Sequence, residues 1–523
     1  MSALLSSWAH RLRYVEGLQH KAWKICSTSL LPWCRSLHVD SPPHTSSLTS
    51  SYVHGTSSFS LLPLTVGQSL DSTVQRWPDR EAVVFLQDSV RKTFAQFQQD
   101  VDKAAAGLLA LGLKRGDRLG VWGPNTYEWI LFQFASAKAG IILVSLNPAY
   151  QVKEVEFTLK QVQCKAVVCP SRFKTQRFCD MLRELCPEIG TTPEGMIKSF
   201  RFDIRLPQVR VCVPVPLYHC FGSVVAGMTM AVHGITLVFP SSGYHSRANL
   251  EAIQSEKCNF VYGTPTMFTD MLIQQDLHKC DLSSIEAGIM AGSPCPPEIV
   301  RKLKTDMNMK EITLGYGTTE NSPLTFLGFP QDSEELKINT VGCIMSHTEA
   351  KVVDPDTGEI VPVGASGELM IRGSCVMHGY WNDPEKTREA ISQDRWYRTG
   401  DTASLTSLGY CCIEGRIKDL IIRGGENIYP AEIEQFLFTH PKVQEVQVVG
   451  VKDERLGEQV CACIRLRKDQ TSSAEEIRAF CKGQISHFKI PHYVIFVNSY
   501  PLTVSGKIKK NILKEEMEKK LGL

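Results

Sequence analysis

Short apolar runs alternate with helical patterns along most of this chain, and that alternation limits the folds open to it. Arg118–Trp122 and Ile141–Leu146 are typical of short buried strands, and Asn125–Ala139 between them has the pattern of a helix. Ala166–Cys169 is typical of a third strand. Strands that alternate with helices imply βαβ units around a mainly parallel sheet. We therefore predict an α/β fold.

Residues that mark the start and the end of a helix support this interpretation. Thr93-Phe-Ala-Gln96 is a capping box that predicts a helix start, and Gly112 and Gly116 follow where that helix should end. Further along the chain, three more apolar runs are typical of strands: Thr236–Phe239, Phe260–Tyr262 and Ile312–Gly315. Ligands of parallel sheets bind at the carboxyl ends of the strands, so the residues just after these runs are candidate site residues.

The pattern changes twice before the end of the chain. From Thr340 to Gly379 the spacing is typical of hairpins and predicts a β-rich subdomain. After Gly415 the sequence predicts a compact α+β unit with a helix at 431–440, strands at 443–451 and 459–466, and a capping box that opens a further helix at Ser473–Glu476. We expect a large N-terminal domain at 64–415 and a small C-terminal domain at 416–523.

The first residues differ in composition from the rest. Residues 1–39 carry five Lys and Arg against one acid, Glu16, together with several serines. An Arg-bearing, acid-poor, amphipathic start is typical of a mitochondrial transit peptide, which we place at residues 1–40, while the plainer alternative is a disordered tail. The following Ser-, Thr-, Pro- and His-rich stretch predicts a linker at 41–63.

Charge and cysteine content exclude several classes of protein. The net charge of +2 gives no overall attraction to nucleic acid or to an anionic membrane. The apolar stretch from Ile130 to Leu146 is interrupted by Gln133, Lys138 and Gly140, so we predict no transmembrane segment. The 18 cysteines form no CxxC pair and mostly lie in apolar runs. Reduced core thiols of a cytosolic or matrix protein explain them.

Residues Gly315–Glu320 combine the groups that a nucleotide site needs. Two glycines allow a close backbone approach, Tyr316 can stack on a base, Thr318 and Thr319 can bind phosphate, and Glu320 can hold Mg2+. A glycine-rich turn without a ligand is the alternative. Downstream, Trp396–Asp401 places an acid after a glycine turn, where it can bind a ribose diol or simply belong to an ordinary turn.

Two later strings are also candidates. Gly415–Glu434 packs charged residues around a strand, a glycine turn and a helix start, and its plain alternative is a surface hairpin. In Pro501–Lys510, Gly506 frees the backbone to present Lys507, whose ammonium suits a phosphate that gains charge in a transition state. A solvated turn is the alternative for that string.

In this order and spacing, these strings resemble the adenylate-forming, or AMP-dependent, synthetase superfamily, from about residue 64 to the end. The finer strings YGTTENSP at 316–323, IIRGGENIYPAEIE at 421–434 and ISHFKIP at 485–491 are similar to mitochondrial medium-chain acyl-CoA synthetases. The resemblance implies a large domain of parallel-rich sheets with helices, a β-rich subdomain and a small mobile α+β C-terminal domain.

The resemblance also implies a role for each matching residue. Glu320 would hold Mg2+, Lys507 would stabilise the acylation transition state, and His219, in the Tyr218–Gly222 string, would lie beside the acyl pocket. Lys418 would be the hinge of the C-terminal domain. The Gly424, Gly425 and Glu426 turn would face coenzyme A. The residues implied in ATP or AMP binding are Ala291, Gly292, Ser293, Gly315, Tyr316, Gly317, Thr318, Thr319, Asp401, Arg416 and Lys507.

The implied reaction uses ATP, Mg2+ and coenzyme A. A fatty carboxylate attacks the α-phosphate to give acyl-AMP and pyrophosphate, and the CoA thiol then displaces AMP. The expected partners are these small molecules, with no nucleic acid. A luciferase-like or peptide-synthetase role is a weaker alternative, since no carrier domain follows Leu523 and the chain does not end in Ser-Lys-Leu.

One expected motif is missing. The superfamily's Ser/Thr/Gly-rich loop ending in Pro-Lys-Gly, which wraps the β- and γ-phosphates, has no match in the chain, and we place the internal loss at about 187–211. Backbone N–H groups of such a loop bind phosphate oxygens, so its loss should cost about 100-fold or more in rate. The alternative to an active ligase is therefore a catalytically impaired isoform or a non-catalytic protein that binds CoA or acyl groups.

Overall fold

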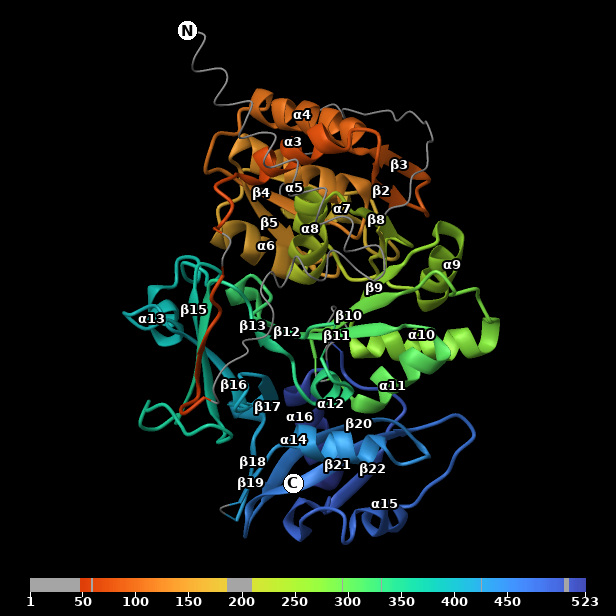
Figure 1. The fold of residues 1–523 in the computed structure, drawn as a ribbon, viewed down its shortest axis with the longest axis vertical. Coiled ribbons are helices and arrows are strands. Elements are labelled where there is room, and N and C mark those ends of the chain that lie inside the picture. Colours follow the sequence, from red (N-terminus) through yellow and green to blue (C-terminus); the bar gives the residue numbers. More distant parts are fainter. Residues whose placement is uncertain are drawn as a thin grey trace, which may run out of the picture.

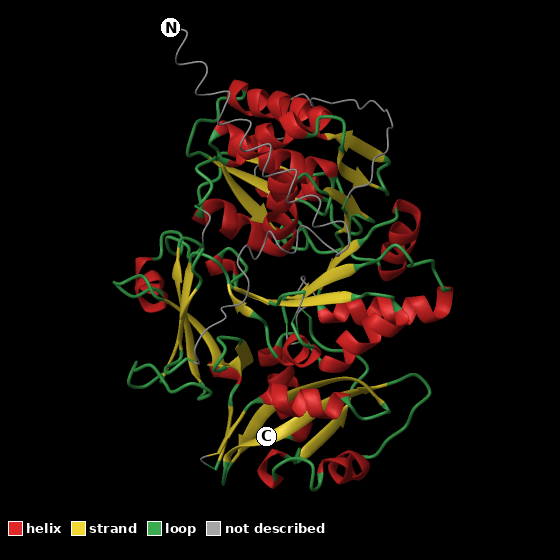
Figure 2. Cartoon of the chain, in the orientation of Figure 1, coloured by secondary structure: helices red, strands yellow, loops and turns green. Residues whose placement is uncertain are grey.

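The computed structural model describes residues 48–57, 60–185, 209–293, 295–330, 332–424, 426–502 and 508–523. Helices surround the strands in the upper part of the molecule, a mostly β region lies to one side, and the C-terminal unit lies at the bottom (Figures 1 and 2). Both the α/β class and the separate C-terminal unit predicted above are present. Within these residues no helix is long and apolar enough to cross a membrane.

The largest sheet has nine strands in the order β13-β12-β11-β10-β9-β7-β8-β2-β3. Its centre is parallel: β7 pairs with β8 and β9, β9 pairs with β10, and β10 pairs with β11. The strands span Glu81–Phe85 (β2), Val90–Thr93 (β3), Arg210–Cys212 (β7), Thr236–Phe239 (β8), Phe260–Gly263 (β9), Ala287–Ala291 (β10), Glu311–Tyr316 (β11), Phe326–Leu327 (β12) and Cys343–Ile344 (β13).

A separate sheet of three parallel strands has the order β5-β4-β6. It consists of β4 (Arg118–Trp122), β5 (Ile142–Leu146) and β6 (Ala166–Val168), close to the ranges that the sequence predicted. The helix between β4 and β5 begins at Tyr127 instead of Asn125. The reason is tertiary, because the buried Asn125 side chain bonds the backbone of Val215 and Leu217 at 3.0 and 2.7 Å.

Helices flank these two sheets. Thr93 and Gln96 form the predicted capping box, and Phe94, Phe97, Val101 and Leu108 of the helix they open are buried in the core. The helices are α3 (Val66–Arg76), α4 (Phe94–Ala110), α5 (Tyr127–Ala139), α6 (Val152–Gln161), α7 (Phe178–Leu185), α8 (Thr229–His233), α9 (Ser246–Glu256), α10 (Pro265–His278), α11 (Pro297–Asp306) and α12 (Glu334–Asn339).

The predicted β-rich subdomain is a five-stranded antiparallel sheet in the order β1-β14-β15-β16-β17. It comprises β1 (Tyr52–His54), β14 (Thr348–Val353), β15 (Gly367–Gly373), β16 (Tyr397–Leu405) and β17 (Cys411–Arg416), with α13 (Pro384–Ala390) beside it. The linker predicted at 41–63 is wrong at β1, which pairs with β14 from about 300 residues away. Its polar composition hid a strand whose partner is remote in sequence.

The chain changes sheets directly after β17. The short turn η4 (Ile417–Asp419) leads into β18 (Ile421–Arg423), β19 (Glu426–Ile428), β20 (Val443–Asp453), β21 (Gly457–Leu466) and β22 (Tyr493–Phe496), which form the C-terminal sheet. Helices α14 (Pro430–Phe438), α15 (Ala474–Cys481) and α16 (Lys510–Leu521) complete this unit. Ser473 caps α15 as predicted, accepting a hydrogen bond from the Glu476 backbone N–H at 3.2 Å.

Candidate functional site

The carboxyl ends of β10 and β11 bring two of the predicted strings side by side. The strands are parallel neighbours, and Ala291 pairs with Gly315 at the end of their register. Gly292 follows β10 with a positive φ of 96°, so the backbone turns sharply there, and Ser293 beyond it is exposed. Tyr316 closes β11 on the neighbouring strand. Of the three apolar runs that the sequence predicted to precede site residues, Ile312–Gly315 belongs to β11, and the end of β11 lies beside the turn that follows β10.

The Asp401 carboxylate lies at the point where the nine-stranded sheet meets the five-stranded sheet. Asp401 in β16 is only 4% exposed and pairs in register with Arg416 of β17. Its Oδ1 accepts from Arg416 Nε at 2.9 Å, and its Oδ2 accepts from the Tyr316 hydroxyl at 2.5 Å. Three residues that the sequence singled out separately thus form one hydrogen-bonded cluster.

Glu320 lies in the short turn η3 (Thr319–Asn321) and faces the β subdomain. Its Oε1 accepts from the Tyr380 hydroxyl at 3.0 Å, and its backbone carbonyl accepts from the Met377 N–H at 2.8 Å. Burial, followed by the nearby Glu320 carboxylate, raises the pKa of Tyr380. The hydroxyl therefore stays protonated and acts as the donor to Glu320.

The two glycines beside Tyr316 have a reason that the sequence did not reveal. A Cβ at Gly317 would stand 1.6 Å from the Pro323 carbonyl oxygen, and a Cβ at Gly315 would stand 2.9 Å from a Leu324 methyl. The atoms that leave no room for a side chain at these two glycines belong to the protein's own backbone and core. Any ligand contact at these glycines would come in addition to that packing.

The hydroxyls of this turn make local contacts. The Thr318 hydroxyl lies 3.4 Å from the Tyr397 hydroxyl, and Thr319 Oγ1 lies 3.6 Å from Cys220 Sγ. The second contact joins the Tyr218–Gly222 string to the turn, and His219 Nδ1 accepts from the Phe221 N–H at 3.2 Å in that string. A π-helix, η2 (Phe221–Met228), follows directly. Such helices are rare and often occur at functional sites.

A cavity of about 470 Å3 opens beside this cluster. It lies between the η3 turn, α13 and the start of β16, so Glu320 faces the same space as Arg416 and other residues of the β subdomain. The lining residues are Glu320, Glu368, Tyr380, Lys386, Glu389, Ala390, Tyr397, Arg398, Thr399, Gly400 and Arg416.

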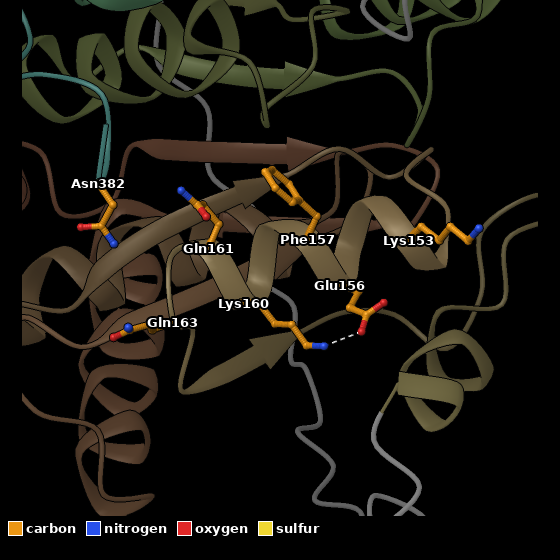
Figure 3. Close-up of a pocket in the computed structure, with 7 residues that line it drawn as sticks. All are labelled: Lys153, Glu156, Phe157, Lys160, Gln161, Gln163 and Asn382. Atoms are coloured by element: carbon orange, nitrogen blue, oxygen red, sulfur yellow. Dashed lines mark hydrogen bonds and ion pairs between the residues drawn. The ribbon is translucent and has the colours of Figure 1, made fainter. Parts of the chain in front are cut away.

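A second hollow of about 500 Å3 lies away from every predicted site residue. It is an open groove along α6, bounded on one side by Asn382, and the Glu156–Lys160 ion pair of 2.5 Å lies on its wall (Figure 3). Phe157 in this groove is 68% exposed. This groove is lined by none of the clustered acids and tyrosines and not by Arg416. The smaller cavity is therefore the candidate site.

The C-terminal residues are partly described. Lys418, the predicted hinge, is exposed in η4, two residues after Arg416 and at the change from one sheet to the next. Gly424 has a φ of 60°, its N–H donates to the Leu456 carbonyl at 2.8 Å, and Glu426 is exposed in β19. Lys507 and Gly425 lie outside the described residues, as do the predicted transit peptide at 1–40 and most of 187–211.

Sequence reasoning missed the tyrosines that line this site. Tyr380 and Tyr397 contact Glu320 and Thr318 from the β subdomain, and the Thr399 hydroxyl accepts from the Asp401 backbone N–H at 3.0 Å. Tyr397 and Thr399 belong to the 396–401 string, where only the acid had drawn notice. Tyr380 carried no comparable signal, because its role depends on a turn 60 residues earlier in the chain.

Comparison with known families gives two matches. The model of the AMP-binding enzyme family matches residues 70–194 and 194–381, in two stretches that meet at residue 194. The model of the AMP-binding enzyme C-terminal domain matches residues 432–507. Together these matches span the nine-stranded sheet and most of the C-terminal unit, while β16 and β17 of the candidate site lie between them.

Among similar proteins is the medium-chain acyl-CoA ligase ACSF2, mitochondrial, of Danio rerio, which is 58% identical over 569 residues, covering 93% of this chain and 94% of that protein. The Homo sapiens protein of the same name is 45% identical over 587 residues, with 96% and 95% covered. The crystal structure of the anthranilate CoA ligase AuaEII in complex with anthranoyl-AMP shares the fold, with a TM-score of 0.78, 23% identity, and 88% of this chain and 99% of that chain covered.

Proposed function

Because the chain belongs to the AMP-binding enzyme family, we propose that it is a medium-chain acyl-CoA ligase, which activates a fatty acid with ATP and transfers the acyl group to coenzyme A. The substrates are a medium-chain fatty acid, ATP and coenzyme A, and the products are acyl-CoA, AMP and pyrophosphate. The relatives that carry this name are similar over nearly their whole length.

The observation that carries the proposal is the Tyr316, Asp401 and Arg416 cluster beside a cavity of about 470 Å3. An aromatic ring, a buried carboxylate and a guanidinium are the groups that suit a base, a ribose diol and a phosphate. They come from two different sheets and meet at the carboxyl end of β11, the edge where open α/β sheets bind ligands.

The chemistry follows in two balanced steps. A carboxylate oxygen of the fatty acid bonds to the α-phosphorus of ATP while the bond to the pyrophosphate oxygen breaks, which gives acyl-AMP and pyrophosphate. The sulfur of coenzyme A then bonds to the acyl carbon, AMP leaves, and the thiol proton passes to solvent. Both steps need positioning and charge stabilisation more than an activated protein nucleophile.

The residues present fit a role for Mg2+. This ion keeps several waters and is usually held by one or two carboxylates together with substrate phosphates, so a dense protein cage is not required. The described residues contain no group of three or more metal-ligating side chains. Glu320, on the wall of the cavity, is the carboxylate that would hold Mg2+, which would neutralise phosphate charge.

Other roles complete the proposal. Lys507 would supply the cation at the α-phosphate, Lys418 would be the pivot of the C-terminal unit, and the Gly424–Glu426 turn would meet coenzyme A after that unit rotates. The exposure of Lys418 in η4 and the left-handed turn at Gly424 support these roles. Gly292, Ser293 and the 315–319 turn would line the adenylate pocket, with His219 beside the acyl chain.

A second candidate is a ligase impaired in its first step, and two findings favour it. The alignment with the Danio rerio relative spans 569 positions yet covers only 93% of the 523 residues of this chain, so the relative has positions with no counterpart here. The family match also breaks at residue 194, inside the interval of about 187–211 where the phosphate loop is missing from the sequence. We infer that this chain lacks the segment that wraps the β- and γ-phosphates.

The two half-reactions separate these candidates. Purified protein is given ATP, Mg2+ and decanoate, and pyrophosphate release is measured. In a second assay, preformed decanoyl-AMP and coenzyme A are supplied, and decanoyl-CoA is measured. An intact ligase performs both steps. An impaired ligase forms decanoyl-CoA in the second assay, while its pyrophosphate release is lower by about 100-fold or more than that of the Danio rerio relative.

Variants and negative results make the assay decisive. Asp401→Asn should weaken both half-reactions, because both use the AMP moiety, whereas Lys507→Ala should weaken the first step. Failure of the chain to form decanoyl-CoA from decanoyl-AMP would contradict the ligase proposal itself. Pyrophosphate release equal to that of the relative would contradict the loss of the phosphate loop.

The relatives are mitochondrial by name, and we propose the mitochondrial matrix as the location of this chain. The basic, acid-poor composition of residues 1–40 supports import. Fusion of residues 1–40 to a fluorescent protein should direct it to the matrix, and replacement of Arg11 and Arg13 by Glu should prevent this.

A further inference from the structure

Two buried amide side chains hold the segment that carries His219 at both of its ends. Asn125 is 5% exposed and bonds the backbone at 215–217, with distances of 3.0 and 2.7 Å. Gln133 of α5 is 9% exposed and donates from Nε2 to the Ser223 carbonyl at 2.8 Å. His219 lies between these two attachments, so α5 and the turn before it set the position of the segment.

The second attachment is made to the π-helix η2. Ser223 is the third residue of η2, and helices of this kind are rare and frequently occur at functional sites. A Cβ at Gly227, one turn further along η2, would stand 3.3 Å from both Nε2 and Oε1 of Gln133. The Gln133 amide therefore lies directly against the backbone of η2, at a place where a larger residue than glycine would crowd it.

Ser223 in turn holds His219. The Ser223 N–H and hydroxyl both donate to the His219 carbonyl, at 3.0 and 3.2 Å, and the Gly222 N–H donates to the same oxygen at 2.9 Å. In the next residue, Cys220 Sγ lies 3.6 Å from the Thr319 hydroxyl of the η3 turn. A continuous series of contacts therefore leads from the core helix α5 to the candidate site.

The other atom of the Gln133 amide makes no such bond. A carbonyl oxygen can only accept, so Nε2 must face Ser223, and Oε1 is buried without a donor among the residues that the structure describes. Trp129 Nε1, one turn earlier on α5, is likewise buried without an acceptor among them. A buried polar atom without a partner costs stability, so packing alone would favour an apolar side chain at position 133. The bond to Ser223 is what the amide contributes.

We propose that Gln133 is a positioning residue that sets where His219 lies beside the acyl chain, and that it thereby determines which chain lengths the ligase accepts. This inference rests on the proposed function, since it assumes that a fatty acyl group lies against the His219 segment. The surroundings suit such a group, because Phe221 and Val225 of η2 and Trp129 of α5 belong to one buried apolar core. Gln133 acts through η2 and does not itself contact the substrate.

The test uses the second half-reaction, which does not require the β- and γ-phosphates. Purified protein is given coenzyme A with either decanoyl-AMP or butanoyl-AMP, and kcat and KM are measured for each. Gln133→Met keeps the length of the side chain and removes the donor. The displaced segment would lose contact mainly with the long chain, and one lost methylene contact is worth about tenfold. The KM for decanoyl-AMP should therefore rise about tenfold, while kcat and the KM for butanoyl-AMP change by about twofold or less.

Two further measurements separate positioning from a general loss of structure. Gln133→Met should bind AMP within about twofold of the wild-type affinity, because the residues proposed to bind AMP lie outside this segment. It should also melt within about 3 °C of wild type, because the loss of the bond to Ser223 is offset by removal of the buried Oε1. Calorimetry and thermal unfolding measure these two quantities.

The same helix provides a matched control. Ser136 is 1% exposed, and its hydroxyl donates to the Gln133 backbone carbonyl at 3.1 Å, within α5. Ser136→Ala therefore removes a buried hydrogen bond of α5 that does not reach η2. It should leave the ratio of the two KM values at that of wild type.

A conservative variant should restore the bond. The apolar core around position 133 favours the protonated form of a carboxyl group, and a protonated carboxyl can donate to the Ser223 carbonyl as the amide does. In Gln133→Glu, the KM ratio should be close to that of wild type at about pH 6 and approach that of Gln133→Met at about pH 9, as the carboxyl loses its proton. This variant also decides the question if Gln133→Met does not fold.

The outcomes distinguish this inference from the function on which it rests. A Gln133→Met protein with the wild-type KM ratio would overturn the positioning role, as would a Gln133→Glu protein whose ratio does not change with pH. Equal rises of both KM values, or the same change in Ser136→Ala, would also overturn it, because they would indicate a general loss of structure. Failure of folded wild-type protein to form decanoyl-CoA from decanoyl-AMP would overturn the proposed function and, with it, this inference.

Discussion

The nine-stranded and the three-stranded sheets are built from similar apolar runs, yet they differ in how well they are covered. All four residues of β8 and of β9 are buried, and Leu237 and Val261 have no exposed surface. In β5 of the smaller sheet, Ile142 is 44% exposed, and all three residues of β6 are half-buried. Parallel strands are normally covered on both faces, so these two edge strands depart from the pattern, whereas Leu119 and Trp122 of the central strand β4 are fully buried.

This difference follows the position of the break in the family match. The small sheet and α7 come directly before residue 194, whereas the residues of the candidate site come from strands that lie after it. Loss of a segment at 194 would remove cover from the small sheet while leaving the Tyr316–Asp401 cluster intact. Stability and phosphate binding should therefore be affected more than recognition of AMP.

The largest effect is expected from adding the segment that we propose is lost near residue 194. A chimera that carries the segment of the Danio rerio relative absent here should raise the rate of ATP-dependent pyrophosphate release by about 100-fold or more, because it returns phosphate-binding N–H groups. It should also raise the melting temperature. Pyrophosphate release with decanoate and thermal unfolding check these outcomes.

The matched control for the chimera is a Gly-Ser insert of equal length at the same place. It should restore neither activity nor stability. A chimera that melts at the same temperature as the original chain would contradict the idea that the small sheet has lost its cover.

A pair of identical substitutions compares the two sheets directly. Ile289 of β10 is 1% exposed, so Ile289→Ala should lower the free energy of unfolding by about 2–5 kcal/mol. Ile142→Ala in β5 should cost about 1 kcal/mol or less, because much of that side chain already faces water. Chemical denaturation measures both, and equal costs would show that Ile142 is buried in solution.

The pH dependence of stability should also differ between the five-stranded sheet and the small three-stranded sheet. Hydrogen bonds from Arg372 lower the pKa of Glu349 in β14 to about 2, below its usual value of 4.5. This pair therefore stabilises the fold above about pH 4.5, and that contribution is lost as the pH falls toward 2. The difference in melting temperature between wild type and Glu349→Gln should shrink over this range.

Asp117, which precedes β4 of the small sheet, provides the comparison. Its pKa is also lowered, first by the hydrogen bond from Lys165. The difference in melting temperature between wild type and Asp117→Asn should also shrink as the pH falls, but by less. If the melting temperatures of wild type and Glu349→Gln differ by the same amount down to pH 2, the ion pair with Arg372 contributes no stability.

The smallest effect is expected on the surface of α6. Phe157 is 68% exposed, so Phe157→Ser should change the free energy of unfolding by no more than about 0.5 kcal/mol. It should nevertheless reduce the binding of a hydrophobic dye, because it removes an aromatic ring from the open groove. In the chimera, a larger cost of the same substitution would indicate that the restored segment covers Phe157.

Much of the fold could be predicted because its signals are local. The capping box at Thr93, the strand at Arg118–Trp122 and the β-rich region after Thr340 are each specified by neighbouring residues. The start of α5 and the strand β1 were missed, because Asn125 and Tyr52–His54 are held by partners about 90 and 300 residues away. Polar composition gives no sign of such pairing.

For the site, the sequence by itself singled out the candidate residues: Tyr316 and Glu320 in one string, and Asp401 and Arg416 in two others. Only the tertiary structure decided how they act together. It joined Tyr316 to Asp401 across two sheets, placed Tyr380 on Glu320, and gave Gly317 a packing role against the Pro323 carbonyl. The reason is that hydrogen-bond geometry between remote strands depends on sheet order and register, which no short string of residues encodes.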